Sequence, residues 1–373
     1  MITNRRRFVS LSAGILICGL NPSHCFSKHK KIESKIYLSA FADSSGAYYL
    51  GDLLDSGRER FRIKLPCRGH GVAQRPNSNE IASFARRPGR YITVVNVLDG
   101  NIIAQIKSLE GRHFYGHGVY SLDGRWLYAT ENEYDSTRGV IGIYDVKESY
   151  RLVETLPTYG IGPHEINLLS NGKILLVANG GIMTHPDSGR NKLNLSEMDS
   201  SLAYIDIDSG KLLSAHRLSP ELKLMSIRHF DLSHDEKVAI VMQYQGPRSH
   251  LHPLVGFQKG SSKIELLSAP KNVGYRMKNY CGSVAFDSTG NLIAVSSPRG
   301  GIISFWSVPE KRFLSFINVK DGCGVASGET PESFLITNGF GQILRHSPLT
   351  YQTDILSVSQ NILWDNHIMK GEV

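Results

Sequence analysis

From Cys67 onward the chain repeats one strand-turn-strand pattern at intervals of about 42 to 65 residues. In GHGVYSLDGRWLYATE, which begins at Gly116, an alternating apolar segment is followed by an Asp-Gly turn, a second strand and a polar loop. Two further runs of β-branched and aromatic residues follow the polar loops, as in ITVVNVLDGNIIAQI. Each unit is therefore predicted to be a four-stranded antiparallel meander, and the interval is typical of propeller blades. The other copies begin at Gly69, Gly162, Arg228, Tyr280 and Gly322.

The two ends of the chain together supply a seventh unit. Segments 37–41, 48–53 and 60–65 match the second, third and fourth strands of a blade, whereas 362–368 matches the missing first strand. Pairing the two ends would close a ring and remove free sheet edges. We therefore predict an all-β fold, a seven-bladed β-propeller with four-stranded antiparallel blades. Two stacked β-sandwiches would not explain why each end carries the part that the other lacks.

Residues 1–31 account for most of the positive charge. The sequence has 42 basic and 34 acidic residues, a net charge of +8, but six basic residues and no acidic residue lie in 1–31. The remaining 36 basic and 34 acidic residues are nearly balanced. Charge therefore gives no evidence for nucleic acid as a partner, and no stripe of basic and aromatic residues supports one.

The same segment has the layout of an export signal. Arg5-Arg6-Arg7-Phe8 resembles a twin-arginine motif, and the mildly apolar run at 9–20 is too short to cross a bilayer stably. We expect export to the periplasm by the twin-arginine route, cleavage near residues 23–27 and no transmembrane span in the mature protein. An ordinary secretory signal with an arginine-rich head is the alternative. Residues 1–31 are thus assigned to the signal and a short linker, and 32–373 to a single propeller domain.

Aligning the seven units on their first strands places one residue of metal-ligand type from each unit at an equivalent position. Asp123, Asp235 and Asp287 anchor this alignment, because each follows its ring residue by six positions. The first strand of a blade is innermost, so the aligned side chains are expected to face the central channel. They are His70, His117, His164, His229, Cys281, Cys323 and His367.

Imidazole and thiolate are preferred ligands of iron, copper and zinc. Because a seven-bladed channel is wide, three or four of these residues could share one ion, but not all seven. Two alternatives stay open: a Gly-His pair that is structural within its blade, as in WD-type propellers, and a channel that holds a small polar ligand or ordered water. The predicted metal ligands are a subset of His70, His117, His164, His229, Cys323 and His367.

Loops after the second strands should lie around the same end of the channel, because successive strands of a meander reverse direction. Two of these loops, 182–200 and 246–253, are long enough to act as lids, although solvated decoration is the alternative. From these loops and from the neighbour of His164 we predict ligand-binding residues. They are Arg86, Arg87, Glu131, Glu165, Asn179, His185, Arg299 and Asn338.

With the blades laid out, nearly the whole chain after residue 31 resembles the bacterial family of unknown function numbered 1513. The resemblance implies an exported seven-bladed propeller without an established activity, similar to partners of periplasmic iron-acquisition systems, beside imelysin-like proteins and haem-containing oxidoreductases. The strings that carry it are FARRPGR from Phe84, EGRHFYGHG from Glu110, YATEN from Tyr128, GPHE from Gly162, ANGGI from Ala178, THPDSGR from Thr184, SSPRGG from Ser296 and WDNH from Trp364.

Three functions follow from these features. The first is a periplasmic propeller that binds a transition metal, such as iron, copper or zinc, or a small ligand at the channel mouth, accessory to metal acquisition. The second is an enzyme of the propeller lactonase or oxidoreductase type with Glu131, Glu165 or a histidine as general base. The third is an interaction scaffold that docks other periplasmic iron-acquisition proteins. The chain has no GxxxxGK[ST], GxSxG or HExxH motif to favour a particular enzyme class.

Overall fold

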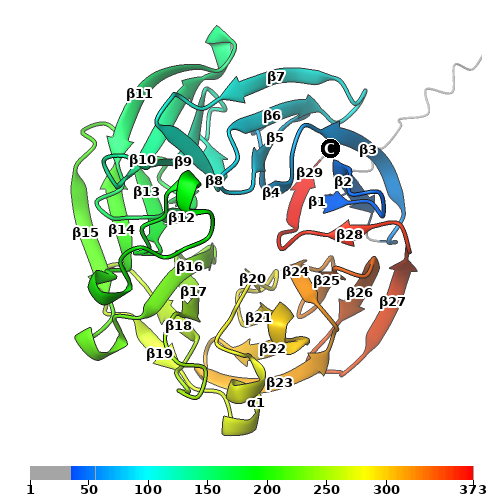
Figure 1. Ribbon diagram of the computed structural model, residues 1–373. Helices are drawn as coiled ribbons and strands as arrows, with labels where there is room; N and C mark the ends of the chain where they lie inside the picture. The colour runs from blue at the N-terminus through cyan, green and yellow to red at the C-terminus, as the bar shows by residue number, and fades with distance from the viewer. Residues whose placement is uncertain (1–34, 55, 373) are drawn as a thin grey trace, which may run out of the picture. The chain divides into compact units, whose positions relative to one another are not determined.

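The computed structural model describes residues 35–54 and 56–372, which belong to one compact unit. The predicted signal at 1–31 lies outside the described residues. The strands form seven antiparallel sheets arranged as blades around a ring (Figure 1). The predicted seven-bladed propeller is confirmed. No helix in the described part of the chain is long and apolar enough to cross a membrane.

Three blades follow one another in the first half of the chain, each numbered from the innermost strand outward. The second blade contains β4 (Gly69–Gln74), β5 (Glu80–Ala85), β6 (Tyr91–Asn96) and β7 (Ile102–Lys107). The third contains β8 (Arg112–Tyr120), β9 (Trp126–Glu133), β10 (Arg138–Asp145) and β11 (Arg151–Pro157). The fourth contains β12 (Pro163–Leu168), β13 (Ile174–Asn179), β14 (Ser201–Asp206) and β15 (Leu212–Arg217).

Three further blades complete the second half. The fifth contains β16 (Met225–Leu232), β17 (Val238–Tyr244), β18 (Val255–Gln258) and β19 (Glu265–Leu267). The sixth contains β20 (Ser283–Phe286), β21 (Leu292–Ser297), β22 (Ile302–Ser307) and β23 (Arg312–Asn318). The seventh contains β24 (Gly322–Ser327), β25 (Phe334–Asn338), β26 (Gln342–His346) and β27 (Thr353–Val358). The connections hold α1 (Lys271–Arg276) and five short 3-10 turns, at Val146–Glu148, Pro186–Ser188, Leu195–Glu197, Pro220–Leu222 and Pro298–Gly300.

The first blade joins the two ends of the chain, as predicted. Its strands β1 (Lys35–Ala42), β2 (Tyr48–Leu54) and β3 (Glu59–Leu65) are completed by β28 (Leu363–Trp364) and β29 (Met369–Glu372), both of which pair with β1. The predicted single strand at 362–368 is thus split in two. Two hydrogen bonds hold the segment between these strands: the main-chain N–H of Asp365 donates to Ala40 O, and the side-chain hydroxyl of Ser39 donates to His367 O at 2.7 Å.

The apolar faces of neighbouring blades pack against each other and form the core. Between the second and third blades, Phe84 from β5 and Phe114 from β8 are fully buried in one cluster with Leu127 from β9. Burying side chains of this size contributes roughly 1.5–3 kcal/mol each. Because each sheet is buried on both faces, the blades hold their innermost strands in fixed positions around the channel.

Candidate metal centre

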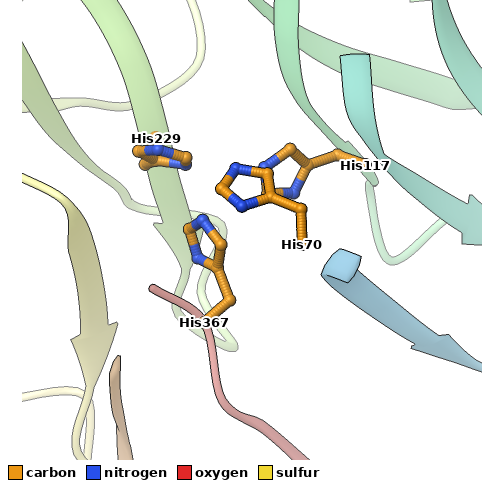
Figure 2. A group of neighbouring side chains, drawn as sticks. All are labelled: His70, His117, His229 and His367. Carbon is orange, nitrogen blue, oxygen red and sulfur yellow. The ribbon is translucent and has the colours of Figure 1, made fainter. Parts of the chain in front are cut away.

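Five histidines from five blades meet in the channel. His70, His117, His164 and His229 come from β4, β8, β12 and β16, and His367 comes from the break between β28 and β29. Their ring centroids lie as close as 4.5 Å, for His70 with His367 and for His229 with both His164 and His367. Figure 2 shows the rings of His70, His117, His229 and His367 facing one another.

The innermost strands are irregular at the positions of these histidines. The register of β12 with β13 shifts between Pro163 and Glu165, which leaves His164 as an extra residue. The register of β16 with β17 shifts between Ile227 and His229, and β4 and β8 have similar shifts around their histidines. A bulge bends its strand and redirects a side chain. The bulges therefore turn the imidazoles out of the regular alternation and into the channel.

One carboxylate holds two of the histidines. His229 Nδ1 donates to Glu165 Oε2 at 2.8 Å, and His117 Nδ1 lies 2.9 Å from Glu165 Oε1. An ionised carboxylate only accepts hydrogen bonds, so each Nδ1 that bonds to it carries the proton. The Nε2 atom of each ring then keeps its lone pair. This carboxylate-histidine arrangement is the one that fixes metal-binding imidazoles in known sites.

A second carboxylate holds His70 in the same way. His70 Nδ1 is 3.2 Å from Asp365 Oδ1, and the other oxygen of Asp365 accepts from Arg68 Nε. Burial opposes ionisation of Asp365, but the contacts with His70 and the nearby arginines hold the pKa of its carboxyl well below the usual range. Asp365 therefore remains an acceptor for His70.

The histidines are neutral in the folded protein. Burial lowers the pKa of His70 and of His229 to about 4, and that of His117 to about 3. Burial together with the neighbouring imidazoles lowers the pKa of His367 well below its usual value. Since neutral imidazole is the form that binds metals, the cluster is ready to act as a ligand set near neutral pH.

The geometry suits a metal ion. One ring nitrogen from each of His70, His117, His229 and His367 lies within 4.8 Å of the others. Two nitrogens that share an ion at bonds of about 2.0–2.1 Å are at most about 4.2 Å apart. Small inward shifts of the rings would therefore bring all four to bonding distance. Nε2 of His117 and of His367 is buried without a hydrogen-bond partner, which is costly unless a ligand satisfies it.

His164 lies beside this group of four. Its ring centroid is 4.5 Å from that of His229 and 5.2 Å from that of His117, but it supplies no nitrogen to the group that lies within 4.8 Å. Its Nδ1 is buried without a partner, and burial lowers its pKa well below the usual value. The predicted ligand His164 thus contacts the four-histidine cluster without completing it.

The structure places the predicted ligand Cys323 apart from the histidines. Its Sγ donates to Thr337 O and Trp364 O, at 3.6 and 3.4 Å, inside the apolar cluster between the seventh and first blades. Burial raises the pKa of its thiol far above the usual value. Cys281 is also fully buried, and burial raises its pKa to about 12. Equivalent strand positions therefore did not give equivalent side-chain directions, and both sulfurs act as core atoms.

The histidine cluster separates two cavities of the channel. His117 and His367 line one of about 330 Å³, together with Glu165 and Asp231. His70 and His164 line another of about 490 Å³, and His229 lines both. Several loops that follow second strands supply lining residues of the second cavity, among them Arg86 and Arg87 after β5 and Arg299 after β21.

The eight predicted ligand-binding residues lie in four different places. Arg86, Arg87 and Arg299 line the larger cavity, and Glu165 lines the smaller one. His185 lies beside a small pocket that it shares with Arg87.

Glu131, Asn179 and Asn338 lie within the blades instead and line neither cavity. Glu131 accepts from Tyr144 Oη, and Asn179 Nδ2 donates to Thr158 O. Asn338 Oδ1 accepts from the main chain of the following turn. All three side chains are buried, and their polar atoms bond to neighbouring strands and turns.

The sequence patterns did not single out several residues of this site. Asp365, Arg190, Lys192, Arg228 and Asp321 are the main ones. Closeness in sequence was the available signal, because Arg228 directly precedes His229 in RHF and Asp365 lies two residues before His367 in WDNH. Bulges bring such neighbours toward the channel instead of away from it.

Fold and site together define a class: a seven-bladed β-propeller with a buried histidine cluster able to hold a metal ion in its channel. Residues 63–371 match the family described as "Protein of unknown function (DUF1513)", and the chain belongs to this family. No curated protein matches the sequence. Among solved structures it is similar to Kuenenia stuttgartiensis hydrazine synthase, with 12% identity, a TM-score of 0.61, and coverage of 86% of this chain and 94% of that one. At that identity the likeness shows the fold alone.

Proposed function

We propose that this protein binds one transition-metal ion, iron, copper or zinc, through His70, His117, His229 and His367, and that it serves metal acquisition in the periplasm. One observation carries the metal proposal: four neutral imidazoles converge within 4.8 Å. Imidazole suits all three metals. The carboxylates of Glu165 and Asp365 would orient three of the four ligands and raise their basicity.

The same contacts favour binding over general-base catalysis by Glu165. Both of its oxygens lie within 2.9 Å of an imidazole Nδ1, so neither is free to take a proton from a substrate. Glu131, the other carboxylate considered as a base, is fully buried and bonded to Tyr144. These positions support a binding role for the centre.

The test is metal analysis of the protein purified after export in its native host. We expect close to one equivalent of a single transition metal, and its loss in the double variant His117→Asn, His367→Asn. His234→Asn is the matched control, because His234 is exposed on the fifth blade. Protein that carries no stoichiometric metal, and that binds none of iron, copper or zinc when each is added, would overturn the proposal.

The cellular part of the proposal rests on the sequence: the Arg5-Arg6-Arg7-Phe8 motif for export, and the family resemblance for metal acquisition. Replacing Arg5 and Arg6 by lysine should leave the protein in the cytoplasm, as measured by cell fractionation. Affinity purification from iron-starved cells should recover other periplasmic iron-acquisition proteins. Unchanged export of the lysine variant would contradict the twin-arginine route. Recovery of no such partner would contradict the role in iron acquisition.

A further inference from the structure

The larger cavity beside the histidine cluster is strongly basic. It has a volume of about 490 Å³, and six basic side chains line it against one acidic side chain, Asp321. The charge is local, since residues 32–373 carry 36 basic and 34 acidic residues. The six basic residues are Arg86, Arg87, Arg190, Lys192, Arg228 and Arg299.

Arg228 is buried without a partner. Its residue is 9% exposed, its Nε has no hydrogen-bond partner, and no acidic side chain of the described residues forms an ion pair with it. Burial and the charge of Arg87 lower its pKa to about 10. An unpaired buried charge destabilises the folded state unless something compensates it.

Two other partly buried arginines, in contrast, are paired with carboxylates. Arg112 contacts Glu133 at 2.9 Å, and Arg125 contacts Asp145 at 2.8 Å. The two cations nearest the aromatic wall of the cavity are held by rings instead: Arg299 lies 4.2 Å from the centroid of Tyr280, and Arg87 lies 5.8 Å from that of Tyr115. Ring contacts position a guanidinium but leave its charge uncompensated.

The cations also disfavour one another. Burial lowers the pKa of Lys192, and the charges of Arg228, Arg299 and Arg87 lower it further. Burial raises the pKa of Asp321, the one acid of the lining. The smaller cavity, of about 330 Å³, has a different charge balance. Two acidic side chains, Glu165 and Asp231, line it with one lysine, Lys370, whose Nζ donates to Gly328 O. The excess of positive charge is therefore specific to one side of the histidine cluster.

We propose that this cavity binds a small polyanion, a molecule with two or more carboxylate or phosphate groups. Guanidinium groups form paired hydrogen bonds with both kinds of oxyanion, and the volume falls within the usual range for small-molecule sites. The long loop between β13 and β14 closes the site by supplying Arg190 and Lys192. Binding needs no metal, so this site goes beyond the proposed function and is tested separately from it.

The experiment is calorimetry on protein freed of metal by a chelating resin, in a buffer without oxyanions at low ionic strength. Citrate and pyrophosphate are the two probes, and glucose is the neutral control. We expect one site per chain for at least one probe, weakened by added salt. Citrate alone would identify a polycarboxylate ligand and pyrophosphate alone a phosphate ligand, and binding of both would identify an unselective oxyanion site.

Variants locate the site. Arg228→Met and Arg299→Gln should each weaken binding at least tenfold, whereas Arg312→Gln should not, because Arg312 is exposed and paired with Glu310. Arg228→Met should also raise the thermal unfolding temperature without anion, since it removes an uncompensated charge, and should abolish the rise that the anion produces in the wild type. If Arg228→Met does not fold, the loss of anion binding is measured in Arg299→Gln and Lys192→Met instead.

Two results would overturn the proposal. One is the absence of heat from both citrate and pyrophosphate at millimolar concentration with wild-type protein. The other is an equal loss of binding in Arg312→Gln and Arg228→Met, which would place the anion outside the cavity. Neither result bears on metal content, so the failure of this site and the failure of the metal centre are distinguishable.

Discussion

The carboxylate of Glu165 accepts a hydrogen bond from Nδ1 of His229 at 2.8 Å, across the boundary between the fourth and fifth blades. Its other oxygen lies 2.9 Å from His117 Nδ1 in the third blade. Burial raises the pKa of Glu165, and the contact with His229 lowers it. One side chain thus positions ligands from two other blades.

Glu165→Gln should weaken metal binding by about 10- to 100-fold, the usual effect of losing a carboxylate behind a histidine ligand. The amide keeps the size of the side chain but can accept from only one of the two imidazoles. Competition titration with a chelator of known affinity measures the change. Glu236→Gln, at a surface residue that bonds to Ser170, should leave the affinity unchanged.

Protonation of the unfolded chain should destabilise the protein below pH 6.5. The pKa values of His70 and His229 fall from about 6.5 to about 4 on folding, so between these values the unfolded state binds protons that the folded state does not. Each such histidine lowers the free energy of unfolding by about 1.4 kcal/mol per pH unit as the pH falls. Denaturant unfolding at pH 7, 6 and 5 measures this slope.

The comparison with His70→Asn isolates the contribution of one histidine. The variant should show a smaller slope, because asparagine does not titrate. Asp231 acts in the opposite direction, since burial raises its pKa to about 6 and the folded state then binds the extra proton. That contribution is common to both proteins and cancels in the difference. Equal slopes would show that His70 is not held neutral.

Gly116→Ala should disrupt the cluster through the backbone. Gly116 has φ of +105°, which side chains rarely allow, and a Cβ there would lie 2.7 Å from Cδ2 of His70. We expect at least tenfold weaker metal binding with a lower unfolding temperature. Gly260→Ala is the matched control, because φ is +55° there and nothing lies within 4 Å of the added Cβ. It should cost some stability but leave metal affinity unchanged.

Cys323→Ala should leave metal stoichiometry and affinity unchanged. The thiol bonds to main-chain carbonyls within the core, so its loss leaves a small cavity and costs about 1 kcal/mol of unfolding free energy. Metal analysis and denaturant unfolding of the same preparation separate the two effects. A loss of metal in this variant would return Cys323 to the ligand set.

Local, periodic information was enough to predict the blades and the ring of histidines. The Asp-Gly turns and alternating strands recur along the chain, and the six-residue offset of Asp123 from His117 aligned the units without any long-range contact. The complementary ends predicted closure of the ring, which β28 and β29 confirm by pairing with β1. Periodicity suffices here because each blade repeats the same local geometry.

Side-chain direction within that ring was decided by the tertiary structure. Cys323 and His367 were equivalent in register, yet Cys323 bonds to the main-chain carbonyls of Thr337 and Trp364 in the core between the seventh and first blades, while the break between β28 and β29 brings His367 into the channel. Bulges and breaks depend on hydrogen bonds to neighbouring strands, which one strand's sequence does not encode.

The sequence by itself determined the number of blades, their closure and five imidazoles around one axis. Only the tertiary structure decided that Glu165 and Asp365 hold three of them, and that Arg228 lies buried and unpaired beside them. The physical reason is distance along the chain: His70 and Asp365 are 295 residues apart, and only the closed ring places them within a hydrogen bond of each other.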